Sequence, residues 1–115
     1  MRKLFVAAAA LAFGMSAPGA PIEAQSQPSV LTVHIKNFMF NPMTATIDAG
    51  DRVTFVNDDD EAHTATAVDH SFDSEGLDAH ASFQHVFSKP GTYSYFCELH
   101  PYMKATIVVR AAGAR

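Results

Sequence analysis

Short stretches in which apolar and polar residues alternate recur along this chain, and they constrain its fold more than any other feature of the sequence. Alternation with a period of two is typical of strands that bury one face. Turn-forming residues, among them Asn41-Pro42 and Pro90-Gly91, separate these stretches. The predicted strands are residues 30–35, 44–47, 52–56, 81–87, 92–97 and 105–109.

This succession of strands predicts an all-β fold of roughly eight short strands, built as a sandwich of two antiparallel sheets. After Gln25, no stretch of ten residues has the periodicity of an amphipathic helix. A length of 115 residues fits one small domain. Nine Phe and three Tyr supply more apolar surface than a disordered chain carries.

Charge and cysteine content narrow the classes of partner and chemistry. The 8 Lys and Arg are outnumbered by 12 Asp and Glu and are scattered along the chain, so we expect no nucleic-acid partner. The single cysteine, Cys97, cannot close an intramolecular disulfide. If Cys97 has a chemical role, that role is as a thiolate.

The N-terminal segment reads as a secretory signal peptide rather than as part of the fold. A basic start, Arg2-Lys3, precedes an apolar run over residues 4–13, and small and turn-forming residues follow that run. A membrane span needs about 20 apolar residues, which this run does not reach, so we expect no membrane anchor. Cleavage is predicted after Ala24, with Ser26 as an alternative, which leaves an acidic mature domain over residues 25–115. Export predicts a periplasmic location in a Gram-negative source.

The residues that carry chemistry lie close together after the strand 92–97. Cys97, His100 and Met103 are separated by two residues each. A thiolate with imidazole and a weak thioether ligand favours copper, whereas structural zinc takes four Cys or His ligands. Taken singly, each residue has an ordinary interpretation as core or surface. The joint pattern in an exported chain with no second cysteine predicts a metal site.

A trigonal copper site needs a second imidazole, and His63 is the best candidate. His63 follows the turn after the strand 52–56, where the loops of a sandwich meet at one pole. Four other histidines compete: two lie within strand patterns and two flank a loop. They are His34 and His85 in the strands, and His70 and His80 beside the loop. Met39 and Met43 are expected in the core or at its rim.

The sequence resembles the cupredoxins, the small blue copper proteins of the plastocyanin and amicyanin group. The resemblance covers nearly all of the mature chain. Its most specific part is Tyr95-Phe96-Cys97 with His100-Pro101 and Met103, and the two-residue spacings resemble those of amicyanins in particular. The other matching segments are residues 37–42, 49–59, 63–64, 72–74, 82–83 and 89–93.

This resemblance implies an eight-stranded Greek-key sandwich with one type 1 copper ion. His63, Cys97 and His100 would be the equatorial ligands and Met103 the axial ligand. Three positions depart from the common pattern: Thr64, Glu98 and Ala105, the last standing where relatives often have Gly. Many relatives have Asn after the first histidine, where this chain has Thr64, whose side chain spans less distance between the ligand loops. Glu98 would lower the reduction potential if its side chain faced the site.

The function implied is that of an exported electron carrier that cycles between Cu(II) and Cu(I), without catalysis of its own. An apolar collar around His100 would be formed by Pro101 and Tyr102 together with Met39 or Pro42. A redox protein would dock there, such as a c-type cytochrome or a dehydrogenase. We expect the carrier to be monomeric. The acidic run over residues 58–61 is either a solvated turn or part of the docking surface, and its neutralisation is expected to leave the visible spectrum unchanged.

Three other functions fit the sequence less well. A module for copper storage or delivery would use a more open site than this closed donor set. A copper oxidase or reductase would need further copper centres and usually further domains. A metal-free adhesion sandwich would leave the spacing of Cys97, His100 and Met103 unexplained.

Overall fold

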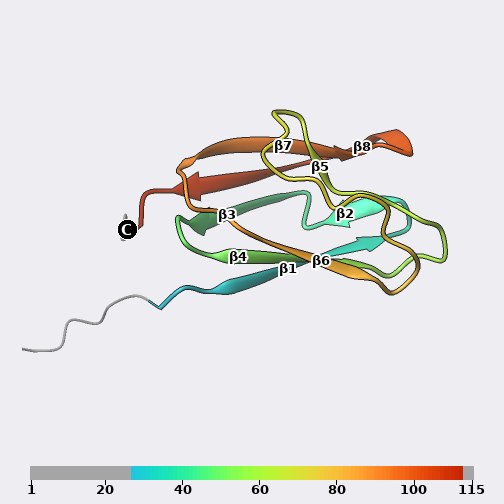
Figure 1. Cartoon of the computed structure of the whole chain (residues 1–115), viewed down its shortest axis with the longest axis horizontal. Coiled ribbons are helices and arrows are strands. Elements are labelled where there is room, and N and C mark those ends of the chain that lie inside the picture. The colour runs from blue at the N-terminus through green and yellow to red at the C-terminus, as the bar shows by residue number, and fades with distance from the viewer. Residues whose placement is uncertain (1–26, 113–115) are drawn as a thin grey trace, which may run out of the picture.

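The computed structural model describes residues 27–112, and this part of the chain forms two four-stranded sheets packed face to face (Figure 1). The first sheet has the order Met39–Asn41 (β2), Val30–Lys36 (β1), Arg52–Asn57 (β4) and Ser82–Val86 (β6). The second has the order Thr44–Asp48 (β3), His100–Arg110 (β8), Gly91–Cys97 (β7) and Thr66–Ala67 (β5). The predicted all-β sandwich of about eight strands is confirmed.

The core lies between the sheets and follows the predicted alternation. In β4, Val53 and Phe55 are buried while their neighbours are more exposed, and Ile107 and Val109 repeat this pattern in β8. Each fully buried side chain of this size contributes roughly 1.5–3 kcal/mol relative to exposure. Aromatic rings fill the centre in edge-to-face and stacked pairs, which involve Phe40, Phe55, Phe72, Phe87 and Tyr95.

The prediction of purely antiparallel sheets is wrong, because each sheet contains one parallel pair. β1 runs parallel to β4, and β3 runs parallel to β8. The reason is the path of the chain. β2 folds back on β1, β3 lies in the opposite sheet, and β4 then returns to the first sheet beside β1. Strands joined by such a crossing between sheets can align in parallel without a hairpin.

The end of the predicted ligand loop also differs from expectation, because β8 begins at His100 rather than near residue 105. Only Glu98 and Leu99 connect β7 to β8, and Cys97 pairs directly with His100 across this hairpin. A shift of register between Phe96 and Cys97 accompanies the turn. The spacing of two residues between cysteine and histidine is therefore the length of a tight hairpin loop.

The predicted signal peptide, residues 1–24, lies outside the described residues. Within residues 27–112, no helix has the length and apolar character needed to cross a membrane.

Candidate metal centre

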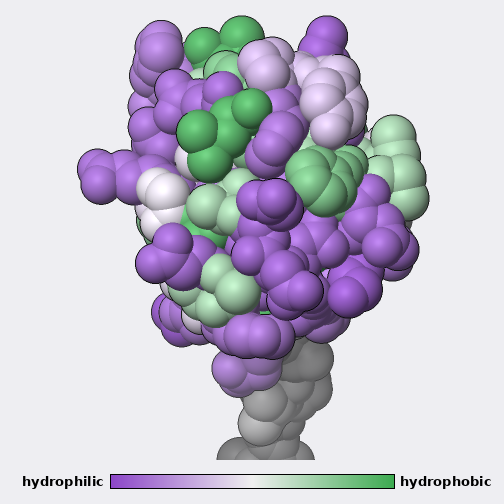
Figure 2. All heavy atoms as spheres, turned by 90° about the vertical axis from the view of Figure 1, so that its right-hand side faces the viewer, coloured by the Kyte–Doolittle hydropathy of each residue, from purple (hydrophilic) through white to green (hydrophobic). Residues whose placement is uncertain are grey.

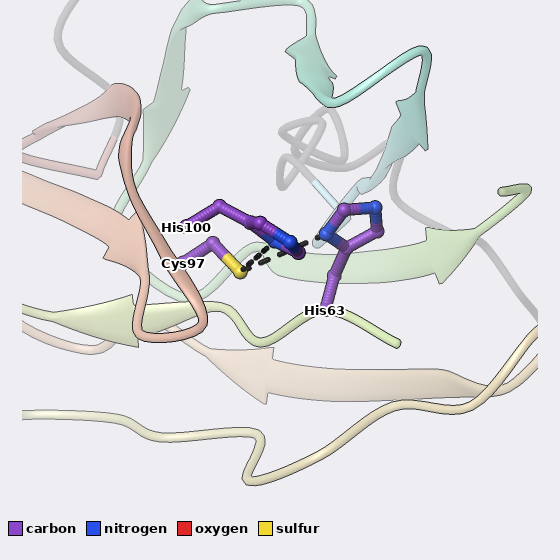
Figure 3. A group of neighbouring side chains, drawn as sticks. All are labelled: His63, Cys97 and His100. Carbon is purple, nitrogen blue, oxygen red and sulfur yellow. Dashed lines mark hydrogen bonds between the residues drawn. The ribbon is translucent and has the colours of Figure 1, made fainter. Parts of the chain in front are cut away.

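Three side chains meet at the end of the sandwich where β8 begins. The Sγ of Cys97 lies 3.7 Å from Nδ1 of His63 and 3.6 Å from Nδ1 of His100. Figure 3 marks these two contacts with dashed lines. The three donor atoms all lie within 4.8 Å of one another. Sequence reasoning predicted these three residues as a cluster, and the structure brings them together.

Backbone pairing fixes the position of each donor. Cys97 and His100 face each other across the hairpin between β7 and β8. His63 comes from the loop between β4 and β5, which is held by a bridge to Leu77. In that bridge the His63 amide donates to the Leu77 carbonyl at 3.1 Å, and the Leu77 amide donates back at 2.7 Å. Residues 34 positions apart in sequence therefore share one site without a covalent link.

The spacing of these donors fits a small transition metal ion. Metal–sulfur bonds of about 2.3 Å and metal–nitrogen bonds of about 2.0–2.1 Å place the sulfur and nitrogen donors of a tetrahedral or trigonal site roughly 3.5–3.8 Å apart. The two observed sulfur–nitrogen separations, 3.7 and 3.6 Å, lie at this value. One thiolate with two imidazoles is a soft to borderline donor set, which suits copper better than the hard cations.

The remaining predicted residues lie as follows. Met103 is buried on β8, three residues beyond His100. None of the four competing histidines joins a potential metal cluster within residues 27–112. His34, His70 and His80 are exposed, and His85 packs between aromatic rings. Met39 and Met43 are more than half exposed, so they lie at the rim rather than in the core.

A buried carboxylate holds His63 from behind. Asp59 is 7% exposed, and its Oδ2 lies 2.9 Å from Nε2 of His63. This contact favours the tautomer with the proton on Nε2, which leaves the Nδ1 lone pair directed towards Cys97. Burial alone would raise the pKa of Asp59, but the amides of Phe38 and Asn37 and the His63 ring bring that pKa below its ordinary value. Asp59 is therefore a carboxylate that orients the donor.

Thr64 links the two ligand segments, although its side chain is shorter than the Asn of many relatives. The Glu98 amide donates to Thr64 Oγ1 at 2.8 Å, and the Thr64 amide donates to Cys97 Sγ at 3.3 Å. The hydroxyl of Thr66 lies 2.9 Å from that of Thr64. A donor to the sulfur and a direct bond between the segments limit movement of the thiolate. Glu98 itself is an exposed residue.

Sequence reasoning missed two residues that contact the donors. Asp59 was assigned to an acidic surface run, and Phe38 was noted only within the family resemblance. Phe38 packs edge-on against both imidazoles, with ring centroids 5.0 Å from His63 and 4.9 Å from His100. Two features of the sequence point to these residues. Asp59 precedes His63 by four residues, and Phe38 follows Asn37 where a tight hairpin usually has Asn-Gly.

Comparison with known sequences gives consistent matches. Residues 4–109 match the family model described as the cupredoxin-like domain. The chain is 33% identical over 118 residues to amicyanin-alpha from Methylorubrum extorquens, which covers 95% of this chain and 99% of that protein. It is 35% identical over 85 residues to plastocyanin from Scenedesmus fuscus, which covers 63% of this chain and 87% of that protein.

Solved structures with the same fold include a Cu(I) form of an amicyanin mutant. It matches with a TM-score of 0.67 at 22% identity, over 70% of this chain and 82% of that one, and this likeness supports the fold alone. A copper-containing nitrite reductase from Thermus scotoductus matches with a TM-score of 0.67 at 31% identity. That match covers 81% of this chain but 25% of the reductase.

Proposed function

The chain belongs to the family of cupredoxin-like domains, and from this premise we propose that it is an exported electron carrier with one type 1 copper ion. The observation that carries the proposal is the clustering of His63, Cys97 and His100, with sulfur–nitrogen separations that suit a bound ion. We assign these three residues as equatorial ligands and Met103 as the axial ligand. Bound copper would supply one-electron chemistry by alternating between Cu(II) and Cu(I).

The protein's part in this chemistry is to keep the donors still. Asp59 fixes the ring of His63, and the Thr64 amide fixes the sulfur of Cys97. Cu(II) and Cu(I) prefer different coordination geometries. Donors that are held in one intermediate geometry move little when the copper gains or loses an electron. Small rearrangement favours fast transfer, and a closed set of protein ligands leaves no position for a substrate. The proposed role is therefore transport of electrons, without catalysis by this chain.

His100 is the proposed route by which electrons enter and leave. Cys97 and His63 are buried, whereas His100 is half-buried, so its ring is the donor group nearest to solvent. Leu99 and Tyr102 on either side are 55% and 68% exposed. Figure 2 views this end of the molecule and shows apolar residues interspersed with hydrophilic ones on its surface. Exposed apolar side chains around a redox group suit a brief encounter with a partner.

The acidic run over residues 58–61 differs in burial along its length, so we restrict its proposed neutralisation to the residues that do not contact His63. Asp59 is buried against His63, whereas Asp60 and Glu61 are exposed. Asp58 is partly exposed and its Oδ2 lies 2.7 Å from Nδ1 of His34, so the fully exposed pair Asp60 and Glu61 offers the freest charges to a basic partner such as a c-type cytochrome. Opposite charges at the rim of an interface act mainly on the association rate.

We expect the double substitution Asp60→Asn and Glu61→Gln to slow association with a basic redox partner several-fold at low ionic strength. Stopped-flow reduction by a c-type cytochrome measures this rate. The visible spectrum of the copper-loaded protein should not change, since neither carboxylate contacts a donor. The difference from wild type should shrink as salt is added, because surface charges are screened. Equal rates at low salt would count against docking at this run.

Repeated redox cycling tests the carrier function against copper delivery. The copper-loaded protein is reduced and reoxidised many times in the presence of a Cu(I) chelator, and the chelator is then assayed for metal. A carrier with this closed donor set should retain its copper through the cycles. Transfer of the copper to the chelator within a few cycles would instead favour storage or delivery.

We also propose the processing and location of the protein. Residues 1–24 would be removed as a signal peptide, and residues 25–115 would act as a monomer in the periplasm. The N-terminal charge and apolar run support export. Mass spectrometry of the protein recovered from a periplasmic fraction would give the cleavage site directly.

A further inference from the structure

The turn between β1 and β2 has an unusual backbone. Lys36 pairs with Met39, so Asn37 and Phe38 alone make the turn, with φ angles of 55° and 59°. Tight hairpins of this shape favour Asn-Gly, because glycine adopts positive φ without steric cost. A bulky aromatic residue in this conformation is uncommon. Strain of this kind persists where the surrounding structure enforces it, and it often accompanies function.

A single carboxylate enforces the strained turn. Asp59 accepts hydrogen bonds from the Asn37 amide at 2.7 Å and from the Phe38 amide at 2.9 Å. The oxygen that accepts from Phe38 also lies 2.9 Å from Nε2 of His63. Asp59 is itself held, because its amide donates to the side chain of buried Asn57. The Asp59 carboxylate therefore holds both the turn and His63, one of the proposed copper ligands.

The consequence is the position of the Phe38 ring. It meets His63 at an interplanar angle of 89° and His100 at 79°, and the two imidazole centroids are 5.0 Å apart. The three rings thus form a compact triangle. Phe38 also lines a groove of about 420 Å³, together with Met43 and the buried Met103. Phe38 therefore both lines this groove and contacts the two imidazoles, which do not line it.

We propose that Phe38 is a positioning and shielding residue, held in a strained turn by Asp59 so that its ring closes the metal centre to small anions and keeps both imidazoles in place. The inference rests on the proposed function, since it takes His63 and His100 as copper ligands. Steric exclusion and edge-to-face packing would act together. Glycine at this position would relieve the backbone strain but would remove the barrier, which explains why the usual Asn-Gly turn is absent.

Titration of the Cu(II)-loaded protein with sodium azide tests the proposal, with visible and EPR spectra as the readout. Wild type should keep its spectrum up to the highest azide concentration used. Phe38→Gly should show a saturable azide-dependent change at concentrations at least tenfold below that limit. Phe38→Tyr retains the ring and should behave as wild type. Met43→Ala widens the same groove without touching an imidazole, so it is the matched control and should also exclude azide. Exclusion of azide by Phe38→Gly would overturn the proposal.

A second readout needs no copper. Because Asn-Gly suits the turn, metal-free Phe38→Gly should unfold at a higher temperature than metal-free Phe38→Ala, which keeps the positive φ with a Cβ. Equal unfolding temperatures would overturn the strained-turn part of the proposal. Failure of the proposed copper centre can be distinguished from failure of the Phe38 proposal. In the first case, wild-type protein would lack the intense copper–thiolate band before any azide is added.

Discussion

Replacement of Cys97 by serine is expected to abolish the intense visible absorption of the copper-loaded protein. It should also weaken Cu(I) binding by more than roughly 100-fold, which is the largest loss usual when a residue hydrogen-bonded to a metal ligand is removed. Cys97 supplies the single thiolate of the proposed site, and the absorption arises from charge transfer between that sulfur and copper. The serine hydroxyl is a harder donor that binds Cu(I) poorly. Titration against a chromophoric Cu(I) chelator measures the loss.

The control for Cys97→Ser is the stability of the metal-free variant. Serine is close to cysteine in size, and its Oγ can accept the hydrogen bond that the Thr64 amide donates to sulfur. The variant should therefore fold, as circular dichroism and thermal unfolding can show. A folded variant that retained both the absorption band and the Cu(I) affinity would contradict the assignment of Cys97 as a ligand.

The second large effect is expected from Asp59→Ala, which should lower the free energy of unfolding of the metal-free protein by about 3 kcal/mol. The change leaves the amides of Asn37 and Phe38 and the Nε2 of His63 without their acceptor. Hydrogen bonds to a charged group contribute about 1.5–3 kcal/mol each, and water can replace part of this. Copper affinity should fall about 10- to 100-fold, because the imidazole loses its orienting partner. Urea unfolding and chelator competition measure the two effects.

The matched control is Asp60→Ala, which removes the neighbouring but exposed carboxylate. Its effect on the free energy of unfolding should stay within about 0.5 kcal/mol, as is usual for surface substitutions. If Asp60→Ala and Asp59→Ala destabilised the protein equally, the loss would reflect the charge of the run rather than the buried contacts of Asp59.

Acid should remove the difference between wild type and Asp59→Ala. The pKa of Asp59 in the folded protein lies below its ordinary value of 3.8, so the carboxylate stabilises the fold above that pH. As the pH falls below 3.8 and through the folded pKa, Asp59 takes up a proton and this contribution is lost. The difference in unfolding free energy should therefore be constant near neutral pH and should shrink towards pH 3. A difference that grew in acid would contradict this account.

The parts of the fold that follow local rules could be predicted from the sequence. Period-two alternation identified the long strands, because one face of each is buried in the sandwich. β2 and β5 were missed, since strands of three and two residues carry too little pattern. The parallel pairs were missed for another reason. They depend on which sheet each strand joins, and alternation within a strand does not encode this.

The candidate site shows the same division. Cys97 and His100 could be predicted from the sequence, because a two-residue hairpin fixes their separation within one segment. His63 required the further step that loops meet at one pole of a sandwich. Asp59 was misassigned because its acidic neighbours Asp58 and Asp60 gave it the appearance of a surface residue. Its burial follows from contacts with a turn more than 20 residues away, which no local pattern records.

The visible and EPR spectra of the purified wild-type protein loaded with one equivalent of Cu(II) test the central claim most directly. Coordination by Cys97, His63 and His100 predicts an intense blue charge-transfer band and a narrow copper hyperfine splitting, both typical of type 1 copper. A colourless protein, or a tetragonal copper spectrum that Cys97→Ser leaves unchanged, would contradict the proposed centre and the electron-carrier function built on it.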